Sequence, residues 1–196
     1  MYALHRTELS TPRLSMRPIR DVDAEALLAI FSNPSVVRYG STLAWDSIEK
    51  ALDKIERNDR GMAAGESVCL AILRKDDRRL IGTADLFQMD LQCRRAEIGF
   101  SLAEEAWGRG YMNEALTAFL DHGFSEFALN RVEADIDPRN TASINCVARL
   151  GFAQEGLLRQ RWIVGGEVSD SAIYGLLRHE WLARRSATDP SPSAAG

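Results

Sequence analysis

The chain has 196 residues, of which 45% are hydrophobic and 27% charged, and its formal net charge is −4. This length suits one domain with a sizeable core. The acidic balance, and the lack of a stretch in which Lys and Arg alternate with aromatic residues, exclude nucleic acid as the main partner. No apolar run reaches the ~20 residues needed to cross a bilayer, so no membrane partner is expected.

The number and spacing of the cysteines bear on metal and redox chemistry. Cys69, Cys93 and Cys146 are odd in number and lack the spacing of a metal site. The start of the chain lacks the charged and then apolar pattern of a secretory signal. The sequence therefore predicts a reducing, cytoplasmic setting and no metal.

The first third of the chain predicts one strand and two helices. Apolar side chains alternate with arginines at first and then recur at spacings of three and four. The expected elements are a strand over residues 12–20, a helix from Asp21 or Asp23 to Asn33, and a helix from Asp46 or Ser47 that ends before Gly61. The buried stripe of the second helix is expected to consist of Ile48, Leu52 and Ile55.

Three strands are predicted next, over residues 67–73, 80–89 and 94–102. Their connections are short and polar, which favours an antiparallel meander. Alternation along the third strand divides its side chains between two faces. The expected core face carries Ala96, Ile98, Phe100 and Leu102, and the face available to a site carries Glu97, Gly99 and Ser101.

The second half of the chain predicts helices and strands in alternation. The expected elements are a helix over residues 113–127, a strand over 131–137, a helix from Asn140 or Thr141 to Gly151, and a last strand over 168–177. The polar residues 186–196 are expected to form a disordered tail after a single domain of residues 1–185. The fold class is therefore mixed α/β, with a sheet at its centre.

Two glycines, Gly108 and Gly110, stand immediately before the helix predicted over residues 113–127. A glycine turn at the start of a helix exposes unpaired backbone N–H groups and the positive end of the helix dipole, which together bind anions such as phosphate. The alternative is a turn whose glycines only supply positive φ. The segment is neither a Walker loop nor a dinucleotide fingerprint, because it lacks the further residues of both motifs.

An ordered set of motifs resembles the GNAT superfamily of acetyl-CoA-dependent N-acetyltransferases, and within it the RimJ/RimL branch. The set consists of "AEIGFSL", "WGRGYM", "NEA" and "NTASINCVARLGFAQEG". The resemblance extends from "TPRLSMRPI" to "YGLLRHEW", which is nearly the whole chain. It implies a GNAT-type fold, in which helices flank a central mixed sheet that is largely antiparallel.

The resemblance also implies that acetyl-CoA is the cosubstrate, with its pyrophosphate on the backbone amides of residues 109–114. The implied cofactor-binding residues are Ser101, Leu102, Arg109, Gly110, Tyr111, Met112, Asn113, Glu114, Asn140 and Ser143. The backbone N–H of Leu102 is a candidate to polarise the thioester carbonyl. The chain departs from the superfamily loop at Trp107 and Met112, and these departures are expected to alter packing more than phosphate binding.

Glu97 is the first candidate for the general base, because it lies on the non-core face of the strand that the cofactor should follow. Its alternative role is an ordinary strand carboxylate paired with Arg94 or Arg95. Asp85 and Asp170 are weaker candidates for the base. Some relatives carry a glutamate further downstream, and the matching position here is Trp162.

Ser143 is implied as the catalytic group that stabilises or protonates the leaving thiolate. Its alternative role, and that of Asn140, is to satisfy the backbone donors at the start of a helix. Many GNAT enzymes use a tyrosine as this acid, but Val147 stands at that position here. An acyl-cysteine at Cys146 is not expected, because no histidine has a visible claim to activate it.

Three functions stay open at this stage. The first is acetylation of a peptide or protein N-terminal α-amine by direct transfer in a ternary complex. The second is acetylation of a small amine such as a polyamine, an amino acid or an antibiotic. The third is an acyl-CoA sensor without catalysis. The sequence likewise leaves both a monomer and a homodimer open.

Overall fold

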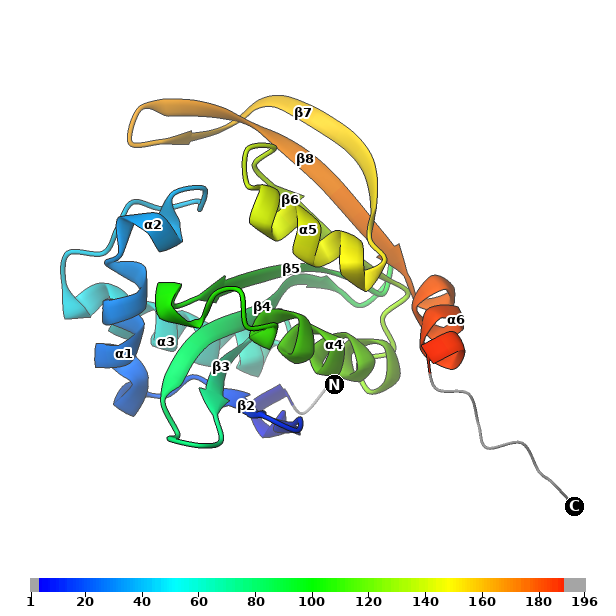
Figure 1. Ribbon diagram of the computed structural model, residues 1–196, viewed down its shortest axis with the longest axis horizontal. Helices are drawn as coiled ribbons and strands as arrows, with labels where there is room; N and C mark the ends of the chain where they lie inside the picture. The colour runs from blue at the N-terminus through cyan, green and yellow to red at the C-terminus, as the bar shows by residue number, and fades with distance from the viewer. Residues whose placement is uncertain (1–3, 189–196) are drawn as a thin grey trace, which may run out of the picture.

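The computed structural model describes residues 4–188, which form a mixed α/β fold around one large sheet (Figure 1). Within this range the sheet has eight strands in the order β1-β2-β3-β4-β5-β6-β8-β7. All neighbouring strands are antiparallel except β5 and β6, which are parallel. The fold class predicted from the sequence is therefore confirmed.

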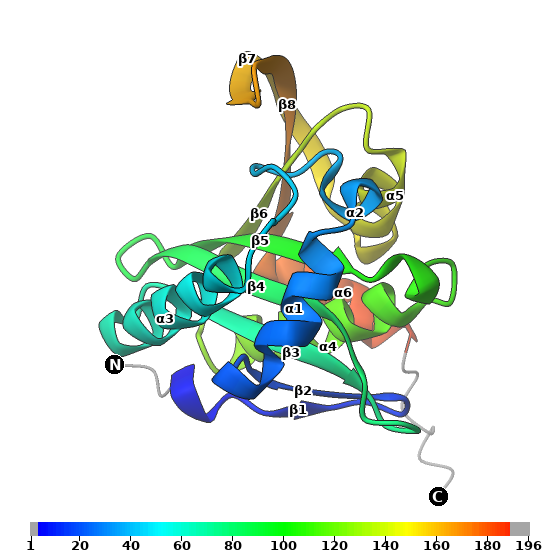
Figure 2. The same cartoon turned by 90° about the vertical axis from the view of Figure 1, so that its left-hand side faces the viewer.

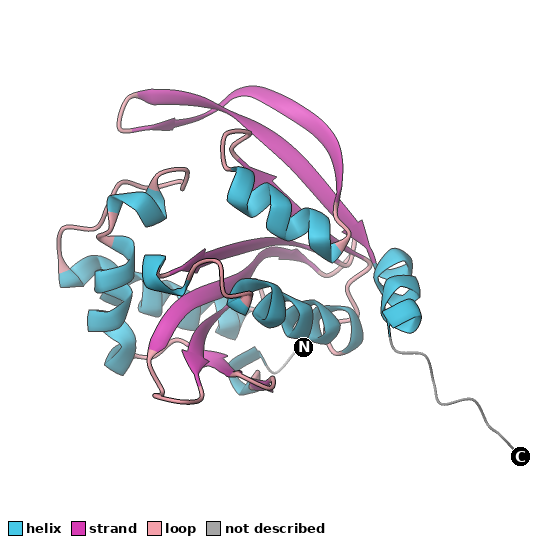
Figure 3. Cartoon of the chain, viewed as in Figure 1, coloured by secondary structure: helices cyan, strands magenta, loops and turns pink. Residues whose placement is uncertain are grey.

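Figure 3 distinguishes the strands from the helices, and Figure 1 labels them in chain order. The strands are β1 (Leu9–Ser10), β2 (Leu14–Pro18), β3 (Val68–Arg74), β4 (Leu80–Asp90), β5 (Arg95–Leu102), β6 (Arg131–Ile136), β7 (Ala153–Val164) and β8 (Glu167–Leu177). The α-helices are α1 (Ala24–Phe31), α2 (Pro34–Val37), α3 (Ile48–Ala64), α4 (Tyr111–Ser125), α5 (Thr141–Leu150) and α6 (Arg178–Thr188). Short 3-10 turns, η1 (Leu4–Arg6), η2 (Asp21–Asp23) and η3 (Glu104–Ala106), connect some of them.

The helices cover both faces of the sheet (Figure 2). On one face α4 packs through Leu116, Phe119 and Phe124 against apolar side chains of β2 to β6. On the other face α1 and α3 pack through Leu27 and Ile55 against β3. Burial of these apolar stripes is the main favourable contribution to the stability of a three-layer fold.

The predicted meander is confirmed, since β3, β4 and β5 pair in sequence and antiparallel. The alternation in β5 is also confirmed. Ala96, Ile98 and Leu102 are buried in the core, whereas Glu97, Gly99 and Ser101 are partly exposed on the opposite face. Phe100 is on the core side of the strand and is only partly buried there. One face of β5 is thus free to line a site.

Two expectations for the helix α3 were wrong. Gly61 does not end it: the helix continues to Ala64, and Gly65 forms the C-cap with φ 76°. Leu52 is exposed at 42%, and the buried side of the helix instead includes Ala51, Ile55 and Met62. Ile55 is buried and Ile48 partly buried, as predicted, so the error is confined to Leu52, and the neighbouring Ala51 is buried instead.

The C-terminal part of the chain contains two elements that the sequence did not predict. The strand β7 is exposed along nearly its whole length, and the helix α6 runs over Arg178–Thr188. Residues 186–188, expected to belong to a disordered tail, are helical, and the rest of that tail lies outside the described residues. The domain end predicted at residue 185 consequently falls inside α6.

A gap in the sheet opens between β5 and β6. The two strands pair over three positions only, which are Arg95–Arg131, Ala96–Val132 and Glu97–Glu133. Beyond Glu97 the strand β5 continues to Leu102 with register partners on β4 alone. Backbone groups of β5 on this side are therefore available to a ligand that enters the gap.

Candidate active site

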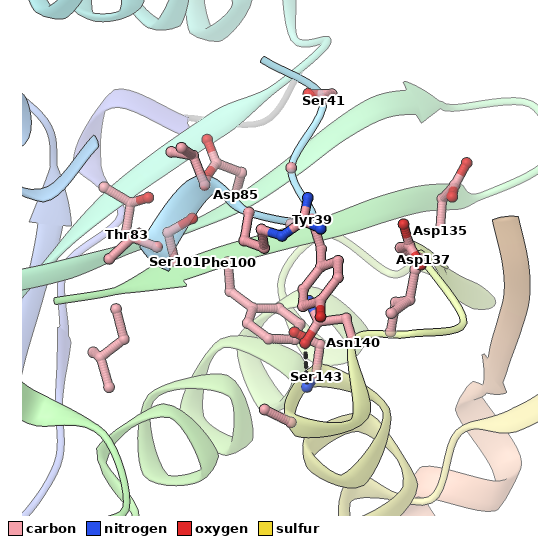
Figure 4. A pocket seen from close by; sticks show the side chains of 18 of the residues that line it. Tyr39, Ser41, Thr83, Asp85, Phe100, Ser101, Asp135, Asp137, Asn140 and Ser143 are labelled. Carbon is pink, nitrogen blue, oxygen red and sulfur yellow. Dashed lines mark hydrogen bonds between the residues drawn. The ribbon is translucent and has the colours of Figure 1, made fainter. Parts of the chain in front are cut away.

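A cavity of about 1770 Å³ surrounds the gap between β5 and β6. Its walls come from β4, β5 and β6, from the starts of α4 and α5, and from the segment 34–44 and the β7–β8 hairpin. Figure 4 shows Asn140 and Ser143 at the start of α5 with Phe100 beside them, and Thr83, Asp85 and Ser101 on the neighbouring strands. The cavity therefore reaches both faces of the sheet.

The start of α4 leaves backbone donors unpaired at the cavity wall. Gly108 and Gly110 have φ values of 71° and 77°, so the turn itself requires glycine. No side chain caps this helix, and the amides of Tyr111, Met112 and Asn113 take part in none of the hydrogen bonds found within residues 4–188. Three unpaired N–H groups at the positive end of a helix fit an anion such as a pyrophosphate.

Hydrogen bonds between Arg13 and Glu114, here called the clasp, hold the glycine turn from the side away from the cavity. The Arg13 Nε donates to Glu114 Oε2 at 2.6 Å, and its Nη1 donates to the carbonyl oxygen of Arg109 at 3.0 Å. The same guanidinium lies 4.6 Å from the ring centroid of Tyr111. Partial burial acts to raise the pKa of Glu114, but hydrogen bonds from Thr11 and Arg13 hold this pKa below its usual value. The carboxylate thus stays ionised and holds the turn.

Most of the predicted site residues line this cavity. The lining includes Glu97, Ser101, Leu102, Gly110, Tyr111, Met112, Asn113, Asn140 and Ser143. Arg109 and Glu114 do not line it. The Arg109 side chain is exposed, and the Glu114 side chain serves the clasp. Trp107, a departure from the superfamily loop, donates from its Nε1 to the carbonyl oxygen of Leu102 at 2.7 Å and so connects the turn to the end of β5.

Glu97 lies at the last paired position before the strands separate. Its carboxylate takes part in none of the hydrogen bonds or ion pairs found within residues 4–188, so the alternative role, a pairing with Arg94 or Arg95, is not found there. Burial, followed by the negative charges of Asp135 and Glu133, raises the pKa of Glu97 to about 7. A carboxylate with this pKa can accept a proton near neutral pH.

Asp135 is a site residue that the sequence analysis missed. It lines the cavity from β6, and its carboxylate accepts hydrogen bonds from the Ser171 hydroxyl and from the Trp162 Nε1, the latter at 3.2 Å. The signal was available, because Glu133, Asp135 and Asp137 alternate along one face of the predicted strand. Trp162, at the position where some relatives carry a glutamate, therefore contributes to the site, because its indole on β7 orients the Asp135 carboxylate on β6.

The other acidic side chains of the cavity are neutralised by basic partners. Asp85 binds the Lys54 Nζ at 2.9 Å. Asp137 and Glu167 both bind Arg139 at 2.6 Å. By contrast, Asp170, a candidate base in the sequence, lies outside the cavity lining and accepts a hydrogen bond from the Gln160 backbone. Within residues 4–188, Glu97 is thus the cavity carboxylate without an ion pair, and Asp135 has a longer one, with Arg161 at 3.9 Å.

At the start of α5, one predicted side chain caps the helix and another is left free. The Asn140 Oδ1 accepts a hydrogen bond from the Ser143 backbone N–H at 3.1 Å (Figure 4). The Ser143 hydroxyl takes part in none of the hydrogen bonds found within residues 4–188 and lines the cavity. Val147 is fully buried, and burial raises the pKa of the Cys146 thiol to about 11. A thiol with that pKa is protonated at neutral pH, which argues against an acyl-cysteine.

Comparison with known proteins identifies this arrangement. Residues 13–153, most of the chain, match the family described as acetyltransferase (GNAT) domain. The chain belongs to the GNAT family. Among its GNAT relatives, the uncharacterized N-acetyltransferase p20 of Bacillus licheniformis is 34% identical over 173 residues, which cover 88% of this chain and 97% of p20. YoaA of Bacillus subtilis is 35% identical over 170 residues, 87% of this chain and 96% of YoaA.

Solved GNAT structures share the fold. Mycobacterium smegmatis RimJ, in complex with CoA-disulfide, superposes with a TM-score of 0.82 at 23% identity, covering 94% of this chain and 98% of RimJ. Spermidine N-acetyltransferase from Vibrio cholerae, in complex with CoA and spermine, gives a TM-score of 0.78 at 19% identity over 88% of this chain and 99% of that chain. This GNAT protein is therefore an acetyl-CoA-dependent N-acetyltransferase.

Two further expectations concern metal and membrane. Among residues 4–188 no group of three or more His, Cys, Asp or Glu side chains is placed to hold a metal ion. Over the same residues, none of the helices has both the length and the apolar character needed to cross a bilayer.

Proposed function

We propose that this GNAT enzyme acetylates the N-terminal α-amine of a peptide or protein by direct transfer in a ternary complex. The observation that carries the proposal is Glu97, an unpaired carboxylate with a pKa of about 7 at the gap between β5 and β6. An α-amine has a pKa of ~7.7 to 8.0, so a base of pKa about 7 is matched to it. A lysine amine, at ~10.4, would cost nearly 5 kcal/mol to deprotonate at pH 7.

Acetyl-CoA supplies the acetyl thioester, and the residues of the chain bind, orient and move protons. The unpaired amides of Tyr111, Met112 and Asn113 hold the pyrophosphate, with Arg109 as an additional charge beside it. The backbone of Ser101 and Leu102 positions the thioester arm. These assignments are supported by the open donors at α4 and by the missing strand partners of β5 beyond Glu97.

Two side chains carry the proton transfers. Glu97 accepts a proton from the acceptor nitrogen, directly or through water, as the new N–C bond forms. The Ser143 hydroxyl donates a hydrogen bond to the sulfur as the C–S bond breaks. Asn140 contributes by capping α5, which fixes the direction of Ser143. Because Cys146 stays protonated, the acetyl group does not pass through a cysteine.

The charges of the cavity favour an acceptor with one ammonium group. Within residues 4–188, Glu97 is the one cavity carboxylate without an ion pair, because Asp85, Asp137 and Glu167 are in ion pairs of 2.6 to 2.9 Å and Asp135 lies 3.9 Å from Arg161. A polyamine needs a second acidic position for its second ammonium group. The relatives include the spermidine N(1)-acetyltransferase of Escherichia coli, 22% identical over 174 residues, and the polyamine is therefore the main competing acceptor.

The test is release of coenzyme A thiol from acetyl-CoA with a matched panel of acceptors. The panel contains peptides with a free N-terminus and no lysine, the same peptides with a blocked N-terminus and one lysine, and spermidine. We expect turnover on the first group, at least tenfold above the other two in kcat/KM. Faster turnover on spermidine would contradict the peptide assignment, and coenzyme binding without turnover on any amine would make the protein a sensor.

A further inference from the structure

The strand β4 contains a bulge directly beside the candidate base. Phe87 pairs with Glu97, but the register then shifts, and the next pair is Asp90–Arg95. β4 therefore advances three residues where β5 advances two, which leaves one extra residue on β4. Bulges of this kind are common next to active sites, where they change the direction of a side chain.

Gln88 is the bulge residue with the unusual backbone. Its φ is 50°, in the left-handed region that residues other than glycine rarely adopt. The next residue, Met89, is buried in the hydrophobic core, and its backbone N–H donates to the carbonyl oxygen of Glu66 at 3.1 Å. The pairing of Phe87 on one side and the burial of Met89 on the other thus hold Gln88 in a conformation that is unfavourable by itself.

The bulge brings Gln88 to the cavity next to Phe87. Consecutive side chains of a regular strand point to opposite faces, so without the bulge Gln88 would take the core side that Met89 occupies here. Instead, Phe87 and Gln88 both line the cavity, and Gln88 is exposed. The Gln88 amide takes part in none of the hydrogen bonds found within residues 4–188, so its donor and acceptor groups are free for a ligand.

Gln88 flanks Glu97 on the side away from the proposed position of the cofactor. From Glu97 to Leu102 the strand β5 borders the gap, which the thioester arm is proposed to occupy. Gln88 follows Phe87 in the opposite direction, toward the part of the sheet where β5 and β6 are paired. An acceptor with its amine at Glu97 has this direction left for the rest of its chain, because the cofactor takes the other.

We infer that Gln88 accepts a hydrogen bond from the first peptide N–H of the acceptor and so distinguishes a peptide from other amines. The inference rests on the proposed function. An extended acceptor advances about 3.3 Å per residue, the same step that separates neighbouring residues of a strand. With the acceptor amine at Glu97, the N–H of its second residue therefore comes level with Gln88, one residue beyond the Phe87–Glu97 pair. Gln88 is thus a specificity-determining residue that binds the acceptor backbone.

The experiment crosses an enzyme substitution with a change of one group in the acceptor. Two short peptides are identical except that an ester oxygen replaces the N–H of the first peptide bond in one of them. The ratio of kcat/KM for the amide to that for the ester is measured with the wild type, Gln88→Gly and Arg94→Gly. Comparing this ratio between enzymes cancels the different basicity of the two amines.

We expect the amide-to-ester ratio of the wild type to be about tenfold higher than that of Gln88→Gly. A site that binds an N–H discriminates against the analogue that lacks it. Arg94→Gly is the matched control, because Arg94 also has a φ of 50° and lies outside the cavity lining, and it should keep the wild-type ratio. Glycine adopts this φ without steric cost but adds entropy to the unfolded chain, so both variants should melt close to the wild type.

Equal amide-to-ester ratios in the wild type and Gln88→Gly would overturn the inference and leave the bulge to the geometry of the β4–β5 turn. The same holds if Arg94→Gly lowers the ratio as much as Gln88→Gly does. A wild type that acetylates spermidine or a lysine side chain, but neither of the two test acceptors, would instead remove the proposed function, and the inference with it.

Discussion

Arg13 and Glu114 are 101 positions apart in the chain, yet the backbone N–H and the Nε of Arg13 both donate to the Glu114 carboxylate, at 2.9 and 2.6 Å. The pair connects the residue just before β2 to the first turn of α4. Since the same guanidinium binds the carbonyl oxygen of Arg109, the pair holds the turn on both sides of Gly110. A residue outside the cavity thereby positions the donors inside it.

The first prediction concerns this clasp. Arg13→Met should weaken coenzyme A binding about three- to tenfold in calorimetry, because the unpaired amides of α4 lose their fixed direction. The matched control is Arg79→Met, since within residues 4–188 the Arg79 side chain makes one ion pair, an exposed contact of 3.4 Å with Glu105. Equal affinities of the two variants would show that the turn keeps its geometry without Arg13.

The second prediction separates the two roles of Gly110. Gly110→Ala and Gly65→Ala impose the same backbone strain of about 1 to 2 kcal/mol, because the two glycines have φ values of 77° and 76°. Both variants should therefore melt at lower temperature than the wild type. Only Gly110→Ala should also lose coenzyme A affinity, about tenfold, since a methyl group there hinders the approach of phosphate. An unchanged coenzyme A affinity of Gly110→Ala would show that Gly110 serves only the backbone geometry of the turn.

The third prediction concerns how the stability of the fold depends on pH through the raised pKa of Glu97. The folded-state pKa, about 7, is above the ordinary value of 4.5, so the fold favours the protonated form. The resulting stabilisation is present below pH 4.5 and is lost as the pH rises through 7. Glu97→Gln should therefore raise the melting temperature at pH 8 and change it little at pH 5. If Glu97→Gln melts at a lower temperature than the wild type at pH 8, the ionised Glu97 carboxylate does not destabilise the fold.

The fourth prediction concerns the influence of Asp135 on the base. In the wild type kcat/KM should fall below pH 7 as Glu97 becomes protonated. Asp135→Asn removes the largest charge contribution to the pKa of Glu97. The fall in kcat/KM on the acid side of the pH profile, the acid limb, should therefore move to lower pH. Asp135→Glu keeps the charge and should keep the limb near 7. Glu97→Gln should lose the limb and about 100-fold or more in rate, and a limb that persists there belongs to another group.

The sequence predicted most of the sheet because its strands alternate. In β5 the buried Ala96 and Ile98 are separated by Glu97, and that pattern is visible in any single chain. β7 carries no such signal, since both of its sides are exposed and it is held by pairing with β8 and by side-chain contacts with distant residues, such as that of Trp162 with Asp135. The helix α6 was missed for a similar reason, because its surface is polar and basic and it buries Trp181 at a single position.

The candidate site was predictable where it depends on local geometry. The glycine turn and the start of α4 are contiguous in sequence, so their unpaired amides follow from Gly110 itself. The network around Asp135 is different, because it joins β6 to Trp162 on β7 and Ser171 on β8.

Only three register positions join β5 to β6, and so only these connect the β1–β5 half of the sheet to the half that contains β6, β8 and β7. A molecule lying across the gap touches both halves and replaces the missing strand pairing. Acetyl-CoA bound across the gap, as proposed, should therefore make the enzyme more rigid as its concentration rises. When acetyl-CoA is scarce, amide hydrogens of β6 and β8 should exchange faster with solvent, and at saturation the two halves should move as one body.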